Sequence, residues 1–156
     1  MGPDNVVYQI TEGGLYAINP DNTIKWSLTP IGTGGRSAPA ISPDGKKIYY
    51  LSKGFSPGLK ALNTLDGSQI WDYSINSFSY SSVAVDNEGT IYFGSTLNAS
   101  LHALNPDGTI KWIYTHPNSS SIGIEAPPAI GTDGTLTIYE SYTKPGSNFL
   151  KPRLEK

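Results

Sequence analysis

The chain lacks the residues that most metal sites, disulfides and membrane spans require. Its 156 residues include no cysteine, which excludes disulfide bonds and thiolate metal sites. The two histidines, His102 and His116, are not at metal-ligand spacing and have no partnered acid, so the sequence predicts neither a zinc site nor a Ser-His-Asp triad. No apolar stretch approaches the roughly 20 residues of a membrane-spanning helix. We therefore expect no metal, no catalytic residues and no membrane span.

The chain also lacks a strong excess of either positive or negative charge. Eleven Lys and Arg residues face 13 Asp and Glu residues, for a formal net charge of −2, and the basic residues are scattered. Binding to nucleic acid relies on clusters of Lys and Arg. The composition therefore argues against a nucleic-acid partner. The opening Met-Gly-Pro-Asp lacks the charged and apolar regions of a signal peptide, so the sequence itself leaves the compartment open.

What the chain does contain is one segment in three copies. LYAINPDNTIKW starts at Leu15, LKALNTLDGSQIW at Leu59 and LHALNPDGTIKW at Leu101, and each copy ends in one of the three tryptophans. The copies lie about 43 residues apart, which is the period of a four-stranded propeller blade. In each copy, alternating apolar residues flank a turn such as Asn105-Pro106-Asp107-Gly108, where Gly108 supplies a positive φ. Asn22 replaces that glycine in the first copy and tolerates the same conformation.

A second hairpin pattern repeats between the tryptophans, as SAPAISPDGKKIYYLS, SSVAVDNEGTIYFGS and APPAIGTDGTLTIYE. Small residues come first, and β-branched and aromatic residues follow the turn. The two hairpins together predict four antiparallel strands in each blade, A to D, with the small residues on the innermost strand A, where strands crowd near the axis. We therefore predict an all-β fold of propeller blades.

The pattern Ala61-x-Asn63-x-x-Asp66-Gly67-x-x-x-Trp71 resembles the repeat of the quinoprotein alcohol dehydrogenase-like propellers, often called PQQ-like repeats. The other two copies are one residue shorter in the turn, and the resemblance covers almost the whole chain. It implies that Trp26, Trp71 and Trp112 are structural docking side chains that pack between neighbouring blades. By resemblance alone, it also suggests a periplasmic or secreted protein.

Length limits the number of blades. At this period the chain holds about three to three and a half blades, whereas a propeller has four to eight. We expect a single partial domain, 1–156, with an incomplete first blade lacking strand A (1–29), two blades (37–74 and 81–115) and a partial blade (126–156). Either a second copy completes the ring, by lending its C-terminal strand A to the first blade, or the chain is part of a longer propeller.

Repeat-equivalent residues that differ in kind suggest a site. Upstream of the aligned alanines at the start of strand A stand Arg36, Tyr80 and Glu125, which we expect to surround the mouth of the central channel. Ordinary solvent exposure, or an Arg36–Glu125 ion pair, would also explain such a set.

Three classes of function follow from these observations. The leading hypothesis is a non-catalytic scaffold, without a cofactor, that binds a protein or another macromolecule through its loop face. A carbohydrate or cell-surface module is the alternative, because Phe55, Phe78, Tyr80 and Tyr142 lie in or near loops. The third is a fragment of a quinone-dependent oxidoreductase, although the chain lacks that family's adjacent cysteine pair and has no recognisable calcium-ligand motif. The recurring Asp44, Asp66, Asp107 and Asp133 are interpreted as turn formers, and His102 as an ordinary blade-surface residue.

Overall fold

The computed structural model describes residues 2, 4–31, 37–53, 56–76, 79–96, 99–117, 122–138 and 140–142. Strands and turns make up this part of the chain. Within it, no helix is long and apolar enough to cross a membrane.

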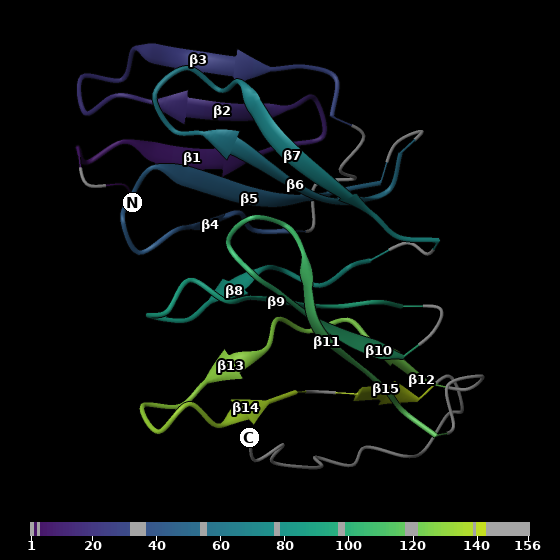
Figure 1. Ribbon diagram of the computed structural model, residues 1–156. Coiled ribbons are helices and arrows are strands. Elements are labelled where there is room, and N and C mark those ends of the chain that lie inside the picture. The colour runs from purple at the N-terminus through teal and green to yellow at the C-terminus, as the bar shows by residue number, and fades with distance from the viewer. Residues whose placement is uncertain are drawn as a thin grey trace.

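Antiparallel sheets follow one another along the chain and stack face to face (Figure 1). The first contains β1 (Val7–Ile10), β2 (Leu15–Ile18) and β3 (Ile24–Leu28). The second contains β4 (Ala40–Ile41), β5 (Lys47–Ser52), β6 (Gly58–Asn63) and β7 (Gln69–Ser74). The third contains β8 (Ala84–Val85), β9 (Ile91–Gly94), β10 (Ser100–Leu104) and β11 (Ile110–Thr115). After them, β12 (Ile122–Ile124) pairs with β15 (Glu140–Tyr142), and β13 (Ala129–Ile130) pairs with β14 (Leu136–Thr137).

Each full sheet has the strand order of a propeller blade, from a two-residue inner strand to a longer outer one. β9 and β10 are buried along their whole length, whereas the outer strands β7 and β11 are alternately exposed and half-buried. Central strands covered on both faces carry continuous apolar runs, and an outer strand with one wet face alternates. The prediction of an all-β fold built from propeller blades is confirmed.

The turns also follow the repeat. The register shifts by one residue at Ala17/Ile18, Ala61/Leu62 and Ala103/Leu104, so each C–D hairpin carries the same bulge. Asn22 has a φ of 66° in the place where Gly67 and Gly108 have 75° and 88°. The predicted exchange of glycine for asparagine in the left-handed region is therefore correct.

Within the described residues, the first sheet contains the three strands β1, β2 and β3. Its β1 is preceded by a turn in which Gly2 N–H donates to Val6 O and Asn5 N–H donates to Gly2 O. Asp86 and Gly89 make the corresponding bonds in the third sheet. β13, the C-terminal strand A of the ring-sharing hypothesis, pairs with β14 of the same chain.

The apolar core lies between the sheets. One cluster joins the first and second sheets, another the second and third, and a third cluster joins the third sheet to β12–β14. Equivalent residues recur in each: Ile48, Ile91 and Leu136 from strand B are all buried. The interface between the first two sheets is called the first interface below, and that between the second and third sheets the second interface.

Candidate functional site

Adjacent strands in each sheet run in opposite directions, so the A–B and C–D turns lie at one end of the sheets and the other connections lie at the opposite end. We call the end with the short A–B and C–D turns the turn rim; it contains residues 42–47, 63–69, 86–90, 105–109 and 131–135. We call the opposite end, where the chain connects strands B to C and passes to the next sheet, the loop rim. Of the predicted binding residues, Tyr80 and Glu125 lie at the end opposite to the observed pockets.

Tyr80 lies on the loop rim and is 42% exposed. Its backbone N–H donates to Thr96 Oγ1 at 3.3 Å. The Nζ of Lys53, from the B–C connection of the second sheet, lies 3.9 Å from the centre of the Tyr80 ring. A cation over an aromatic face is attracted by the ring quadrupole. Tyr80 thus has an exposed side chain, a cation over its ring and a hydrogen bond at its backbone N–H.

Glu125 is also exposed, directly after β12. Its neighbour Ala126 accepts a hydrogen bond at its carbonyl from Ser81 Oγ at 3.1 Å, so the segments that carry Glu125 and Tyr80 lie side by side. Arg36, the third predicted residue, lies outside the described residues. The segment that follows Arg36 lies beside the segment that follows Tyr80, because Ala38 N–H donates to Ser82 Oγ at 2.9 Å.

Trp26 and Trp71 each extend from one sheet to the C–D turn of the next. Trp26 Nε1 donates to Thr64 O at 3.0 Å, and Trp71 Nε1 donates to Pro106 O at 3.2 Å. The rings also lie against turn glycines, because a Cβ on Gly67 or Gly108 would come within 2.8 Å of the indole.

Trp112, the third predicted docking residue, packs against Tyr92 and belongs to the cluster between the third sheet and β12–β14. The C–D turn that would follow it in the repeat falls outside the described residues. Within its own sheet, Trp112 therefore contacts a strand-B tyrosine, as Trp26 and Trp71 do in theirs.

A tyrosine accompanies every tryptophan, which the sequence analysis did not identify. Tyr8, Tyr49 and Tyr92 occupy the same register on strand B, and their ring centres lie 5.7 to 5.9 Å from Trp26, Trp71 and Trp112. Tilted ring pairs at this distance add to the energy of burial. The signal was present in the sequence, since each tyrosine pairs across the sheet with an alanine of the recognised repeat, namely Ala17, Ala61 and Ala103.

The recurring aspartates serve the turns. Oδ1 of Asp21, Asp66 and Asp107 each accepts the backbone N–H and the hydroxyl of the residue two positions on, at 2.6 to 3.0 Å. These hydrogen bonds lower the pKa of all three carboxyl groups. Asp44 accepts from Ser42 Oγ and Lys46 N–H, and Asp133 accepts from Thr135 N–H. Turn formation explains these carboxylates without a catalytic role.

His102 is buried, so its interpretation as a surface residue was wrong. Only 7% of it is exposed, and its ring stacks on Phe93 at 4.8 Å with 6° between the planes. Tyr73, from the outer strand of the second sheet, covers it with a ring edge and places its hydroxyl 3.3 Å from Nδ1. Burial lowers the pKa of His102 to about 4. The side chain is thus a neutral component of the second interface.

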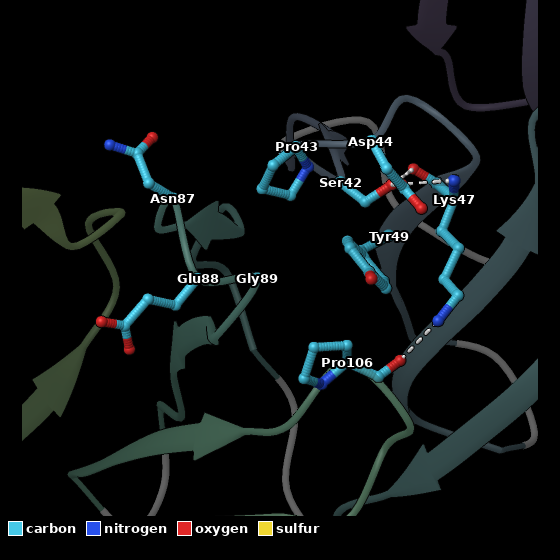
Figure 2. A pocket seen from close by; sticks show the side chains of 9 residues that line it. All are labelled: Ser42, Pro43, Asp44, Lys47, Tyr49, Asn87, Glu88, Gly89 and Pro106. Carbon is cyan, nitrogen blue, oxygen red and sulfur yellow. Dashed lines mark hydrogen bonds between the residues drawn. The ribbon is translucent and has the colours of Figure 1, made fainter.

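A pocket of about 210 Å³ opens on the turn rim between the second and third sheets (Figure 2). Pro43 and Pro106 lie on two sides of it, with Tyr49, Asp44 and Glu88 among the other lining residues. The Tyr49 hydroxyl is buried and has no hydrogen-bond partner in the described part of the protein. Burial, and secondarily the charge of Asp44, raises the pKa of Tyr49 to about 12.

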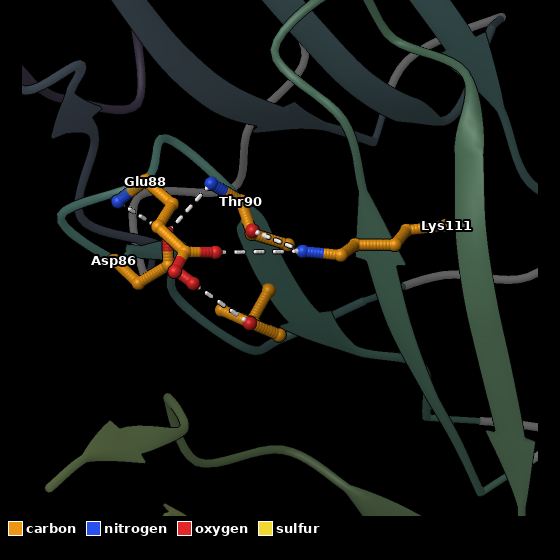
Figure 3. A network of polar contacts seen from close by, with 5 residues as sticks. Asp86, Glu88, Thr90 and Lys111 are labelled. Carbon is orange, nitrogen blue, oxygen red and sulfur yellow. Dashed lines mark hydrogen bonds and ion pairs between the residues drawn. The ribbon is translucent and has the colours of Figure 1, made fainter. Parts of the chain in front are cut away.

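A second groove, of about 470 Å³, follows between the A–B turns of the third sheet and of β13–β14. Asp86 lies at its edge in a network of polar contacts (Figure 3). Asp86 accepts the N–H groups of Glu88 and Thr90 and the hydroxyl of Tyr92, at 2.8 to 3.0 Å. Burial would raise the pKa of Asp86, but these hydrogen bonds outweigh it and lower the pKa. Lys111 closes the network by donating to Thr90 Oγ1 at 2.9 Å.

Across the described ranges, no three His, Asp or Glu side chains gather as a metal site. The residues brought together on the loop rim are an exposed tyrosine, a lysine over its ring and a nearby glutamate. Such a group can make hydrogen bonds, ion pairs and aromatic contacts with a partner surface.

Sheet order, stacking and turn chemistry define this chain as a set of β-propeller blades. Solved structures with the same fold include BamB from Moraxella catarrhalis, with a TM-score of 0.68 and 16% identity over 88% of this chain and 44% of that one. Quinohemoprotein alcohol dehydrogenase from Comamonas testosteroni is similar with a TM-score of 0.65 and 13% identity, over 88% of this chain and 28% of that one.

Regucalcin, a calcium-binding protein from Agrobacterium tumefaciens, is similar with a TM-score of 0.57 and 17% identity, over 89% of this chain and 50% of that one. The chain thus spans half or less of the length of these three proteins. No family model matches it, and no curated protein does. The likeness establishes the propeller fold, and the alcohol dehydrogenase represents the quinoprotein propellers whose repeat the sequence resembles.

Proposed function

We propose that the chain is a non-catalytic propeller scaffold that binds a protein through its loop rim. The observation that carries this proposal is Tyr80, an exposed aromatic side chain with the Lys53 Nζ over its ring and with its backbone N–H bonded to Thr96 Oγ1. Tyrosines that are rigid before binding contribute large contact areas at a low entropic cost. Glu125, on the adjacent segment, supplies a charge that can orient the partner.

The proposal includes completion of the propeller. Among the described residues, none pairs with the inner edge of β1 in the way that β4 and β8 pair in the other sheets. A second copy of the chain or the remainder of a longer propeller would fill that place. Unpaired strand edges of this kind favour association. Light scattering over a concentration series would distinguish a dimer from a monomer.

Selection from a peptide display library tests the binding function. Peptides selected on the wild-type chain are expected to lose affinity at least tenfold for the double variant Arg36→Ala, Tyr80→Ala, because Tyr80 would be a central contact. The matched control is Leu65→Ser, which replaces a side chain 71% exposed on the turn rim and should leave binding unchanged.

Two results would contradict this function. Selected peptides that bind the double variant as tightly as the wild type would place the interface elsewhere. A rise in melting temperature on adding a quinone cofactor with calcium would instead support the oxidoreductase fragment, since a ligand of the folded state stabilises it. The double variant should melt at the wild-type temperature, because Tyr80 is exposed.

A further inference from the structure

The three strand-B tyrosines differ in what their hydroxyls contact. Tyr8 donates to Thr64 O of the next sheet at 3.4 Å, and Tyr92 donates to Asp86 Oδ2 at 2.9 Å. The hydroxyl of Tyr49 is buried without a partner in the described part of the protein. A buried hydroxyl without a hydrogen bond is unfavourable, so this group calls for an explanation.

The reason lies at the turn carbonyl of the second interface. At the first interface, Thr64 O accepts both Trp26 Nε1 and the Tyr8 hydroxyl. At the second, Pro106 O accepts Trp71 Nε1 and, at 2.9 Å, the Nζ of Lys47. Lys47 thus takes the place that the tyrosine hydroxyl has at the first interface. Tyr49 is left beside the pocket of about 210 Å³ described above.

The dimensions of this pocket suit a small ring. A cavity of about 150 Å³ accommodates benzene, so this one leaves room for a six-membered ring with substituents. Pro43 and Pro106 provide apolar surfaces on two sides (Figure 2). Such surfaces favour the C–H faces of a ring over a flexible chain or a bare ion.

Charge narrows the class of ligand further. Asp44 is held in its turn by Ser42 and Lys46, which keeps the pKa of its carboxyl low. Glu88 belongs to the other side of the pocket, but its carboxylate points away from Tyr49 (Figure 2) and pairs with Lys111 at 4.0 Å. The Asp44 carboxylate disfavours an anion, while Lys47 is directed at Pro106 O. A simple cation offers no acceptor for the Tyr49 O–H. Hydroxyl groups both accept and donate, so they satisfy the tyrosine and the Asp44 carboxylate together.

We propose that this pocket binds a polyhydroxylated ring of monosaccharide size, with the Tyr49 hydroxyl and the Asp44 carboxylate as its hydrogen-bonding partners. The source is a free sugar or one residue of a glycan chain. The site lies on the turn rim and does not depend on the proposed protein binding at the loop rim.

Titration by NMR with D-glucose, D-galactose, D-mannose and a short oligosaccharide of each tests the proposal on the whole chain. At least one sugar should shift the backbone amide signals of Lys47 and Gly89 and saturate with a dissociation constant in the millimolar range, as expected for about a dozen non-hydrogen atoms. Tetrahydropyran, a ring without hydroxyls, should not. Tighter binding of the oligosaccharide would identify a glycan as the source, and equal binding a free sugar.

Tyr49→Phe should weaken that binding at least tenfold, and Tyr92→Phe is the matched control, because its hydroxyl bonds to Asp86 instead. Glu88→Gln is a second control and should leave binding unchanged, because that carboxylate points away from Tyr49 and pairs with Lys111. Absence of amide shifts with every sugar would overturn the proposal. It would also be overturned if Tyr49→Phe bound as tightly as the wild type, which would leave the hydroxyl to an ordered water.

Discussion

The first and second interfaces are built from the same repeat but differ in the second donor to the turn carbonyl and at one position on strand C. In both, a tryptophan donates to the carbonyl of the next C–D turn and lies against a turn glycine. Lys60 on β6 pairs across the sheet with Tyr50, and His102 on β10 pairs with Phe93, so the two occupy equivalent places.

Lys60 extends to Asp72, 3.8 Å away, whereas His102 stays between Phe93 and Tyr73. The repeat thus supplies the docking contacts of both interfaces, and we expect the variable position on strand C to determine whether an interface responds to pH. Four substitution experiments test this contrast.

Removing the docking tryptophans should have the largest effect. Trp26→Ala and Trp71→Ala should each lower the free energy of unfolding by about 2 to 4 kcal/mol, because the indole fills the interface and its N–H bond to a turn carbonyl is lost. Urea denaturation measures both. Leu65→Ala, at a side chain 71% exposed, should change stability by less than about 0.5 kcal/mol. Equal effects of all three would show that the tryptophans do not dock the blades.

Acidification should distinguish the two interfaces. The pKa of His102 is about 4 in the fold and 6.5 is its ordinary value, so between these pH values the unfolded chain binds a proton that the folded chain does not. The free energy of unfolding should therefore be constant above pH 6.5 and fall by up to about 3 kcal/mol as the pH drops to 4.

His102→Phe, which retains an aromatic ring, should remove this dependence. The turn aspartates, whose pKa values are lowered from 3.8, lose most of their contribution below that pH and overlap with the window only at its acid end. Urea midpoints from pH 7 to 4 are the measurement. An unchanged slope in His102→Phe would assign the pH dependence to other groups.

A methyl group at either turn glycine should have an intermediate effect. Gly67→Ala and Gly108→Ala should each cost about 2 kcal/mol, because the positive φ disfavours a side chain and the new Cβ meets the indole at 2.8 Å. Thermal unfolding followed by tryptophan fluorescence measures the loss. Gly13→Ala, whose Cβ would make ordinary contacts, should be nearly neutral. A neutral Gly108→Ala would mean that Trp71 does not pack there.

The ion pair of the second sheet should have the smallest effect. Lys60→Met should change the free energy of unfolding by less than about 1 kcal/mol, since Asp72 is 41% exposed and solvent weakens the attraction. Chemical denaturation at low and high salt checks this. A loss well above that value, reduced by salt, would show that the first interface also depends on a charge.

Much of this architecture was predictable because the repeat encodes local backbone geometry. Pro106-Asp107-Gly108 specifies a turn, and its Asn22 counterpart keeps the same φ, without reference to any other blade. The tryptophan period gave the blades, and the small residues of Ala40 and Ala84 marked the inner strands. The candidate site was predictable only as a position on the loop rim, since Tyr80 depends on Lys53 and Thr96 from other segments.

The sequence by itself thus determined the blade period, the hairpin turns and the face of each strand, because these depend on neighbours within a few residues. Tertiary structure alone decided that His102 is buried and that Tyr49 has no hydroxyl partner. Both depend on what the adjacent sheet presents. Tyr73 covers His102 in one case, and in the other Pro106 O is already bonded by Lys47, which lies on the same strand as Tyr49. Stacking of whole sheets brings these residues together across long separations in sequence, and a single blade's pattern contains no record of its neighbour.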